Sequence, residues 1–287
     1  MNFAKLVRCG LTLVSPKLNT KVCYRVKFGR SINLKDPDTL DEKILKMKLE
    51  EFGSDELVRE CADKYRVRSY IERKGCKEIL VPLIAAYDKA EEIDWETLPN
   101  RFAMKWNFGC GFNIICADKN KMNKSQVIDT MRKWGKTDYY LEYSELQYKN
   151  VKKKIIVEQF LDEGNGSTPS DYKIYCFNGK PYCVMLCTGR ESGHAKYYFF
   201  DKNWNFLRIN RNGKEAPEGF SIPKPAGIDM AFEYAERLCE PFKFVRVDLY
   251  LVQGRVYFGE LTFTPSGGMD SSRLPETDLM FGKMLHI

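Results

Sequence analysis

Residues 244–263 read Phe244-Val-Arg-Val-Asp-Leu-Tyr-Leu-Val-Gln-Gly-Arg-Val-Tyr-Phe-Gly-Glu-Leu-Thr-Phe263, and apolar and polar side chains alternate along this run. Alternation with a period of two is typical of strands that bury one face. In the first strand the apolar face holds three aliphatic side chains, and the opposite face holds Arg246, Asp248 and Tyr250. We therefore interpret the polar face of this predicted hairpin as a candidate functional site.

The turn of this hairpin decides which face Glu260 joins. We expect a three-residue loop at 252–254, with Gly254 in the left-handed conformation. That register puts Glu260 opposite Arg246 and diagonally next to Asp248, whereas a two-residue loop puts it on the other face. Two carboxylates on one surface suit Mg²⁺, which takes one or two protein carboxylates besides water and phosphate oxygens. A ladder of opposite surface charges is the alternative.

Signals along the rest of the chain predict a mixed α+β protein. Thr39-Leu-Asp-Glu42 reads as a capping box that begins a helix, and Ser54 is expected to cap a second helix that runs to about Tyr70. Asn178-Gly179 is a strong hairpin signal between strands at 171–177 and 180–187. Further strands are expected at 79–84, 101–106, 114–117, 155–161, 196–200 and 204–209, and further helices at 125–135 and 229–240.

Composition narrows the class of protein. A length of 287 residues favours two or three packed units, and the net charge of +7 suits phosphates, nucleic acid or an anionic membrane face. We expect no nucleic-acid partner, and we interpret the basic run 149–154 as a solvated linker, with a binding patch as the alternative. The ten cysteines are scattered, which favours reduced thiols in the cytoplasm. The chain has only two histidines, His194 and His286, which argues against a catalytic triad built on histidine and against a His-rich zinc site.

The N-terminal segment is apolar and basic but too short to span a bilayer. Five apolar side chains fit one side of a helix: Phe3, Leu6, Val7, Cys9 and Leu13. Two interpretations stay open, a helix docked on the protein's own core and a helix in contact with a membrane surface. The corresponding locations are the cytoplasm and the inner face of the membrane.

The order of motifs resembles the ATP-grasp superfamily, which includes D-alanine:D-alanine ligase. Arg246-Val-Asp248, followed by Glu260-Leu-Thr-Phe-Thr-Pro265 and two glycines, is similar to the RxD and ExN…PG signatures of that superfamily. Asp63-Lys64 through Arg68, the Lys105 strand with its glycine loop, and Val157-Glu-Gln-Phe-Leu161 precede them in the expected order. From about Asp38 to Met269 the chain looks most like the TupA-like ATP-grasp family, which is associated with bacterial surface polysaccharides.

This resemblance implies an α+β ATP-grasp fold, in which two α+β subdomains clasp ATP, with a short helical N-terminal region. The implied division is 1–62 for the helical region, 63–157 for the first subdomain and 158–287 for the second. The resemblance also implies ATP and Mg²⁺ as cofactors. Lys105 and Arg246 are the implied catalytic residues, and Asp248, Glu260 and Thr262 are the implied metal ligands. Thr262 departs from the asparagine that is usual at this position of the superfamily.

The remaining implied site residues fall into two groups. Those expected to contact the nucleotide, besides Lys105, are Asn107, Gly109, Gly111, Glu158, Gln159, Phe160, Leu161, Glu163 and Lys173. Glycine suits a loop whose backbone approaches phosphate. Those expected to contact an acidic substrate are Arg68, Arg190 and His194.

The implied activity is that of a carboxylate–amine ligase that forms an acyl phosphate, with a uronic acid or related acid and an amine as substrates. An ATP-dependent sugar kinase is the first alternative, and a nucleotide-binding partner without ligase activity is another. A glycosyltransferase is a third alternative, because Asp36-Pro-Asp38 resembles a DxD motif. Its position directly before the predicted helix cap at Thr39 favours a helix start instead.

Overall fold

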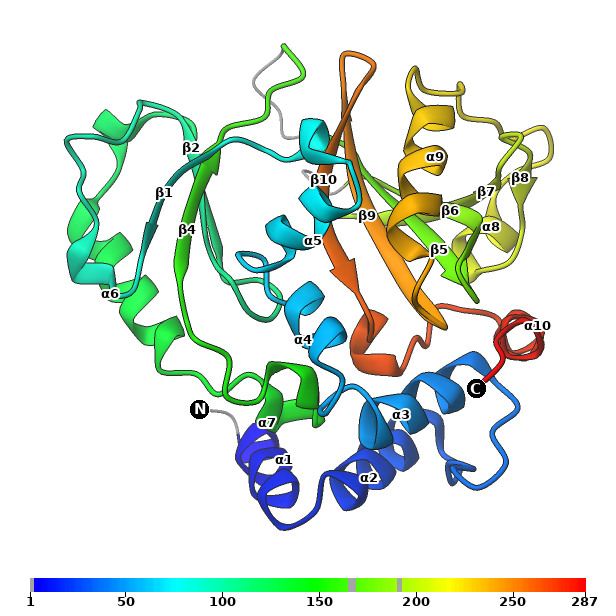
Figure 1. Cartoon of the computed structure of the whole chain (residues 1–287). Coiled ribbons are helices and arrows are strands. Elements are labelled where there is room, and N and C mark those ends of the chain that lie inside the picture. Colours follow the sequence, from blue (N-terminus) through cyan, green and yellow to red (C-terminus); the bar gives the residue numbers. More distant parts are fainter. Residues whose placement is uncertain (1–2, 165–168, 190–192) are drawn as a thin grey trace.

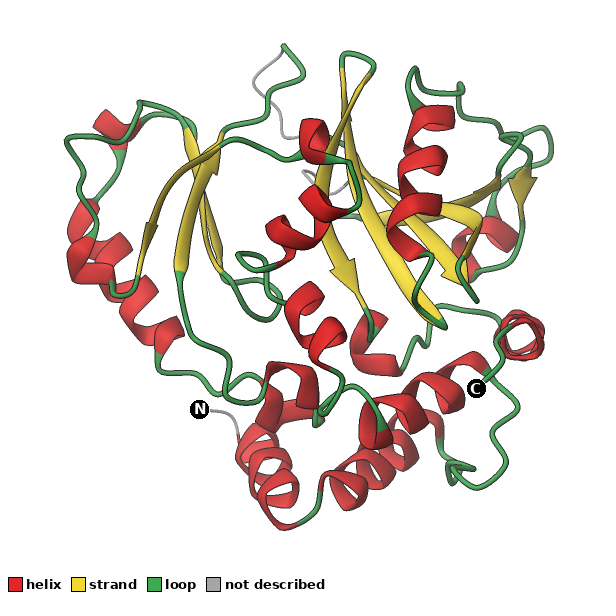
Figure 2. Ribbon diagram, in the orientation of Figure 1, coloured by secondary structure: helices red, strands yellow, loops and turns green. Residues whose placement is uncertain are grey.

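The computed structural model describes residues 3–164, 169–189 and 193–287, which form two antiparallel sheets with helices around them (Figure 1). The first sheet has the strand order β1-β4-β2-β3 and the second has the order β10-β9-β5-β6-β7-β8. Figure 2 shows the two sheets side by side, with helices between them and below them. The strands are β1 (Leu83–Tyr87), β2 (Phe102–Trp106), β3 (Asn113–Cys116), β4 (Ile155–Gln159), β5 (Asp171–Phe177), β6 (Lys180–Thr188), β7 (Lys196–Asp201), β8 (Phe206–Leu207), β9 (Phe244–Val252) and β10 (Arg255–Thr262).

The helices cover the outer faces of both sheets and the lower part of the molecule in Figure 1. Short 3₁₀ turns lie between them, among them η1 (Lys77–Ile79), η3 (Lys119–Lys121), η4 (Leu146–Tyr148) and η5 (Pro265–Gly268). The α-helices are α1 (Phe3–Val14), α2 (Pro16–Phe28), α3 (Leu40–Glu50), α4 (Glu56–Ala62), α5 (Val67–Arg73), α6 (Lys124–Gly135), α7 (Tyr140–Tyr143), α8 (Arg211–Glu215), α9 (Ile228–Cys239) and α10 (Pro275–Met284).

Each sheet has its own apolar core. The larger core joins the second sheet to α9 and to side chains of α3, α4 and α5, with Phe232, Val247 and Phe281 fully buried within it. The smaller core packs α6 on the first sheet through Met104 and Met131. The two sheets occupy residues 83–159 and 171–262, and the division of the chain at 62/63 and 157/158 stays a prediction.

The hairpin register differs from the expected one. The turn between β9 and β10 has two residues, Gln253 and Gly254, both with positive φ, so the predicted three-residue loop is wrong. A bulge at Gly259 then inserts one extra residue, and Glu260 lies directly opposite Asp248. A Cβ on Gly259 would lie 2.8 Å from the carbonyl oxygen of Asp248, so glycine suits this position. Because of the bulge, Glu260 lies on the polar face. In a regular hairpin with a two-residue turn it would lie on the opposite face.

The helix expected over 54–70 is broken in two. Asp63 ends α4, and its Oδ1 accepts hydrogen bonds from the backbone N–H groups of Tyr65 and Arg66 at 2.8 and 3.1 Å. Its Oδ2 accepts from Asn107 Nδ2 at 2.7 Å. An aspartate that satisfies nearby backbone donors competes with a continuing helix. The break turns Lys64 toward the glycine loop, a placement that the helical pattern did not predict.

Other boundaries shift by a few residues. The strand expected at 79–84 begins at Leu83, because η1 and Pro82 occupy its start. Asp55, Asn123 and Gly227 stand at the N-caps expected at Ser54, Ser125 and Asp229. The strand expected at 204–209 is reduced to Phe206–Leu207. The Thr39 cap and the Asn178-Gly179 hairpin are confirmed, the first by a hydrogen bond from the Glu42 N–H to the Thr39 hydroxyl.

The N-terminal helices α1 and α2 dock on α7 through polar groups. Thr12 Oγ1 lies 2.8 Å from Ser144 Oγ, and Asn19 Nδ2 donates to Thr12 Oγ1 at 2.8 Å. Thr12 is the only residue of α1 that is buried. The apolar side of α1 stays exposed, with Phe3 at 79% and Leu13 at 70%. The interpretation of a helix docked on the protein's own core therefore fits the position of α1, but it does not account for the apolar side chains of α1, which stay exposed.

Because Lys48 on α3 is buried, we expect it to make the stability of the protein depend on pH. Its side chain is fully buried and Nζ donates to the carbonyl oxygen of Tyr143 at 2.6 Å, and burial lowers the pKa of Lys48 to about 8. An unfolded lysine has a pKa of about 10.4, so between these values the unfolded chain binds more protons and the Lys48 contribution to the free energy of unfolding rises with pH.

We compare the free energy of unfolding of the wild type with that of Lys48→Met. The wild-type value minus the variant value should increase by about 3 kcal/mol between pH 7.5 and pH 10.5. Urea denaturation at a series of pH values measures it. Lys121→Met, at an exposed position on η3, is the control and should show no such change. A flat difference for Lys48 as well would contradict the burial of a charged ammonium.

Candidate functional site

Three adjacent strands bring opposite charges into one row. Lys173 on β5 pairs with Asp248 on β9, which pairs with Glu260 on β10. Arg246 holds Asp248 in a bidentate contact, with Nε and Nη2 2.7 and 2.6 Å from its two carboxylate oxygens. Lys173 Nζ lies 2.8 Å from Asp248 Oδ2 and 2.5 Å from Asp171 Oδ2. Arg246 and Asp248, both expected on the polar face, are thus in direct contact.

Glu260 is surrounded by positive charge. Lys64 Nζ lies 3.1 Å from Glu260 Oε2, and the Thr262 hydroxyl donates to Glu260 Oε1 at 3.2 Å. Burial opposes the charged form, but Lys64, Lys173 and Arg246 outweigh it and lower the pKa of Glu260 to about 2. Glu260 is therefore an ionised carboxylate at neutral pH, in the form that binds a divalent cation.

The glycine loop after β2 is held from two sides. Gly109 and Gly111 both have positive φ, and Lys64 Nζ donates to the Gly109 carbonyl oxygen at 2.6 Å. Asn107 was expected at the nucleotide, but its side chain is buried and bonded to Asp63 and to backbone groups of residues 152 and 154. Its amide thus anchors the base of the loop, and Nδ2 directs its hydrogen bonds to Asp63 and residue 152.

Lys105 forms an ion pair with Glu158 on β4, at the start of the segment that was expected to be the adenine hinge. Its Nζ lies 2.7 Å from Glu158 Oε2, and Arg68 Nη1 lies 3.2 Å from Glu158 Oε1. Arg68 also donates to the carbonyl oxygen of Val81 at 3.0 Å. This places Arg68 beside the Lys105–Glu158 pair, and its contact with an acidic substrate stays a prediction.

A cavity of about 490 Å³ opens between the two sheets. We call it the first cavity. Ten of the predicted site residues line it: Lys105, Gly109, Gly111, Glu158, Gln159, Phe160, Leu161, Lys173, Arg246 and Glu260. Val81, Ala103, Ile115 and Phe160, which directly follows β4, provide apolar lining. The cavity thus combines an apolar part near the end of β4 with lysine, arginine and carboxylate groups.

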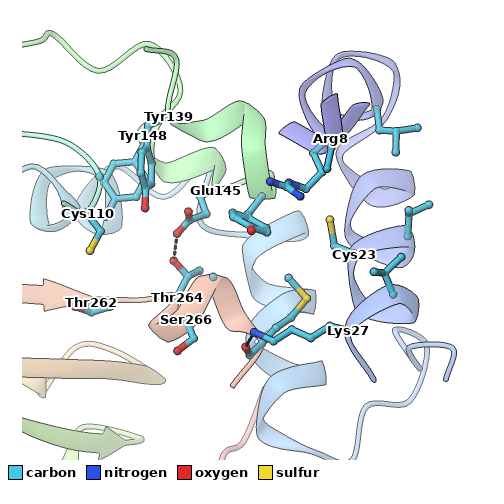
Figure 3. Close-up of a pocket in the computed structure, with 18 of the residues that line it drawn as sticks. Arg8, Cys23, Lys27, Cys110, Tyr139, Glu145, Tyr148, Thr262, Thr264 and Ser266 are labelled. Atoms are coloured by element: carbon cyan, nitrogen blue, oxygen red, sulfur yellow. Dashed lines mark hydrogen bonds between the residues drawn. The ribbon is translucent and has the colours of Figure 1, made fainter. Parts of the chain in front are cut away.

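A second cavity of about 750 Å³ adjoins the first. It shares four lining residues with the first cavity, Gly109, Cys110, Arg246 and Glu260. Figure 3 shows Glu145, Tyr148, Thr262, Thr264 and Ser266 on one side of it and residues of α1 and α2 on the other. Arg246 on β9 and Glu260 on β10 therefore lie where the two cavities meet.

Some predicted site residues lie elsewhere. Asp248 is 2% exposed and lines neither cavity, because Arg246 and Lys173 cover it. Glu163 is exposed and accepts a hydrogen bond from the Ser170 N–H at 3.1 Å. His194 is exposed and lines neither cavity, and Arg190 lies outside the described residues.

Other residues of the site were given no role from the sequence. Asp171 lines the first cavity and Glu145 lines the second. Lys64 and Tyr250, which lie within the quoted motifs, also line the first cavity. For Lys64 a usable signal was the aspartate before it, since aspartate favours the start of a new helical turn. Among the described residues no group of three or more His, Cys, Asp and Glu side chains is placed to hold a metal ion.

The comparisons with known proteins agree with the expected family. A family model described as TupA-like ATPgrasp matches residues 42–286. No curated protein matches the chain. D-alanine–D-alanine ligase from Bacillus anthracis in complex with ATP is similar at 16% identity and a TM-score of 0.47, over 78% of this chain and 61% of the ligase.

Two further solved structures are similar at lower identity. L-amino acid ligase from Bacillus licheniformis shares 12% identity at a TM-score of 0.47, over 93% of this chain and 57% of that one. The ATP-grasp ligase PsnB, in complex with Mg and ADP, shares 12% identity at a TM-score of 0.40, over 84% and 66%. The chain thus spans less than two thirds of the length of these ligases. The family match covers most of the chain and confirms the expected ATP-grasp fold, and the chain belongs to the TupA-like ATP-grasp family.

Proposed function

We propose that this protein is an ATP-dependent carboxylate–amine ligase that acts through an acyl phosphate. The observation that supports it is the meeting of two cavities at Arg246 and Glu260. A ligase of this kind must hold a nucleotide on one side of the reacting groups and an acceptor on the other. The first cavity has the lysines and the glycine loop for a nucleotide, and the second has the volume for an acceptor.

In this proposal the nucleotide lies along the first cavity. Gln159, Phe160 and Leu161 hold adenine at the apolar end, while Lys105 and Lys173 contact the phosphates. The loop with Gly109 and Gly111 covers the phosphates with its N–H groups, as glycine-rich loops can where a backbone approaches an anion.

Mg²⁺ fits the donor set of the charged row. Asp248 and Glu260 are opposed carboxylates, and Thr262 adds a hydroxyl, so all the available donors are the hard oxygens that Mg²⁺ prefers. Asp248 becomes available once nucleotide phosphates draw Lys173 and Arg246 away from it, since both cations now contact its oxygens. When bound, the ion would supply positive charge that neutralises the nucleotide phosphates.

The chain's own residues then account for much of the chemistry. An acceptor carboxylate oxygen bonds to the γ-phosphorus as the bond to the ADP oxygen breaks, and an amine nitrogen next displaces phosphate from the acyl carbon. Arg246, at the junction, stabilises the charge that grows on the transferred phosphoryl group. Positioning by the two cavities supplies the rest, because fixed geometry removes most of the entropic cost of bringing reactants together.

The acceptor in this proposal is a uronic acid or related acid of bacterial surface polysaccharide biosynthesis, in line with the family's association. Of the residues expected to contact its negative charge, Arg68 and His194 do not line the second cavity and Arg190 lies outside the described residues, so these contacts stay predictions. A sugar kinase that uses the same nucleotide site, and a nucleotide-binding partner without ligase activity, are the competing functions.

The experiment is incubation with Mg-ATP, a panel of uronic acids and a panel of amines and amino acids. ADP release that needs both substrates, together with a product mass equal to the amide, supports the ligase. A phosphorylated sugar formed without an amine would establish the kinase instead. ATP binding without turnover for every pair would favour the non-catalytic alternative.

We further propose a cytoplasmic protein positioned at the inner face of the membrane through α1 and α2. Residues 1–35 contain eight basic and no acidic residues, whereas the rest of the chain holds 38 basic and 39 acidic residues. Large apolar side chains on these helices are exposed, among them Phe3, Leu13, Val14 and Val26 at 70–82%. Exposed apolar groups with surrounding basic charge suit the surface of an anionic bilayer. No helix in the part of the chain described is long and apolar enough to cross a membrane.

Flotation with lipid vesicles tests this placement. We expect binding to vesicles that contain phosphatidylglycerol and little binding to pure phosphatidylcholine. Lys17→Gln combined with Lys21→Gln should lower the partition coefficient by about 30-fold, since each basic residue near the surface contributes about 1 kcal/mol. Lys202→Gln combined with Lys214→Gln removes the same charge from another surface and should bind as the wild type does. Equal binding to both lipid types would contradict the proposal, whatever the enzymatic outcome.

A further inference from the structure

A buried carboxylate outside the charged row also lines the second cavity. Glu145 lies between α7 and η4, is 5% exposed and lines the cavity, as Figure 3 shows. Its Oε1 accepts a hydrogen bond from the Thr264 hydroxyl at 2.6 Å. Gln147 Nε2 donates to that hydroxyl at 2.9 Å and so fixes its direction. Within the described chain this is the one side-chain hydrogen bond that Glu145 makes, so its carboxylate retains acceptor capacity for a ligand.

Aromatic rings flank this carboxylate. Tyr139 and Tyr148 both line the second cavity, with their ring centroids 5.3 Å apart in an edge-to-face arrangement. A carboxylate beside tyrosine rings recognises a cation through charge and through the ring quadrupoles. An organic cation therefore matches this wall of the cavity better than a second acid does.

Burial and the neighbouring polar and charged groups together set the pKa of Glu145. Burial raises its pKa, with Thr264 and then Lys48 opposing the rise and Glu142 adding to it. Lys48 itself is directed to the Tyr143 carbonyl oxygen and makes no hydrogen bond to Glu145 among the described contacts. A carboxylate with a raised pKa is a better proton acceptor at neutral pH than an exposed one.

We propose that Glu145 binds the amine substrate of the ligase and accepts its proton as the amide bond forms. The inference rests on the proposed ligase function and deepens it, because it assigns the amine to the second cavity. The substrate class is a primary amine or amino acid that reaches the cavity as an ammonium ion.

The ammonium group gives one proton to solvent and becomes a neutral amine, whose nitrogen lone pair forms the N–C bond to the acyl carbon. The C–O bond to phosphate breaks and phosphate leaves with that electron pair. The nitrogen then loses its second proton to the Glu145 carboxylate, which releases it to solvent after the product departs.

Hydroxylamine separates this role from the first half of the reaction. It is largely unprotonated at neutral pH and traps an acyl phosphate as a hydroxamate without needing a protein base. We expect Glu145→Gln to form hydroxamate within about threefold of the wild-type rate, while kcat/KM for the amine falls by about 100-fold or more. Glu145→Asp should recover part of the amine reaction, and Glu96→Gln, at an exposed surface position, should leave both reactions unchanged.

The outcomes distinguish the two levels of the proposal. A wild-type protein that forms neither amide nor hydroxamate removes the ligase function itself. A wild type that forms both, with a Glu145→Gln variant that retains the wild-type amine reaction, overturns only the role of Glu145. Equal loss of amide and hydroxamate in that variant also overturns it, because the defect then lies in acyl phosphate formation.

Discussion

Glu260→Gln is expected to lower kcat of the proposed ligase reaction by more than about 100-fold and to raise the Mg²⁺ concentration needed for half-maximal rate. The reason is that the amide keeps the shape of the side chain but loses the charge that Lys64, Lys173 and Arg246 now maintain. Steady-state ADP release over a Mg²⁺ titration measures both effects. Asp248→Asn should lose activity to a similar degree.

The two variants differ in their effect on folding. Asp248 is buried and bonded to Arg246 and Lys173, so Asp248→Asn leaves Arg246 without this charged partner and Lys173 with Asp171 alone. Breaking a buried ion pair from one side costs about 3 kcal/mol in the free energy of unfolding. Glu260→Gln is therefore the cleaner test. Asp229→Asn and Glu233→Gln make the same chemical changes at exposed positions of α9 and should keep full activity. Rates like those of the wild type in Glu260→Gln would remove the metal assignment.

Lys105→Met is expected to lower kcat/KM for ATP by about 100-fold or more, because it removes a positive charge that we place against the phosphates. The change leaves Glu158 buried with Arg68 as its remaining cationic partner, so the strand keeps its charge compensation. Nucleotide titration by fluorescence and steady-state kinetics measure the loss of affinity and of rate.

The control for Lys105 lies in the same half of the molecule. Lys121→Met removes an equal charge from the exposed η3 turn and should leave ATP kinetics unchanged. If Lys105→Met binds and turns over ATP as the wild type does, the nucleotide lies elsewhere, and the first cavity loses its proposed role.

Strands and the polar face were predictable because their signals are local. Alternation along β9 and β10, and the Asn178-Gly179 turn, each depend on a few adjacent residues. The exact register was not, because a bulge has no strong signal beyond one glycine among several. The predicted face of Glu260 was nevertheless right, since the bulge and an odd-length turn have the same effect on strand parity.

The position of side chains at the site depended on contacts that are distant in sequence. Asn107 was expected at the nucleotide because of its place in the loop, but its partners are Asp63 and the backbone near residue 153. Lys64 reaches Glu260 only because the predicted second helix breaks at Asp63. Periodicity within one segment carries no information about such pairings. The family motifs identified ten of the residues that line the first cavity, whereas packing decided which polar groups are paired within the protein itself.

The bulge at Gly259 also bears on how this hairpin can change over evolutionary time. Residues 249–259, which separate the two acidic positions, are odd in number, and a regular hairpin with a two-residue turn needs an even number between opposed residues. Loss of the single glycine would leave both acids facing each other across an unbroken ladder. The hairpin can therefore be one residue shorter with the two acids still opposite each other. A search for distant relatives that requires a fixed spacing between the two acids would miss proteins with the shorter hairpin.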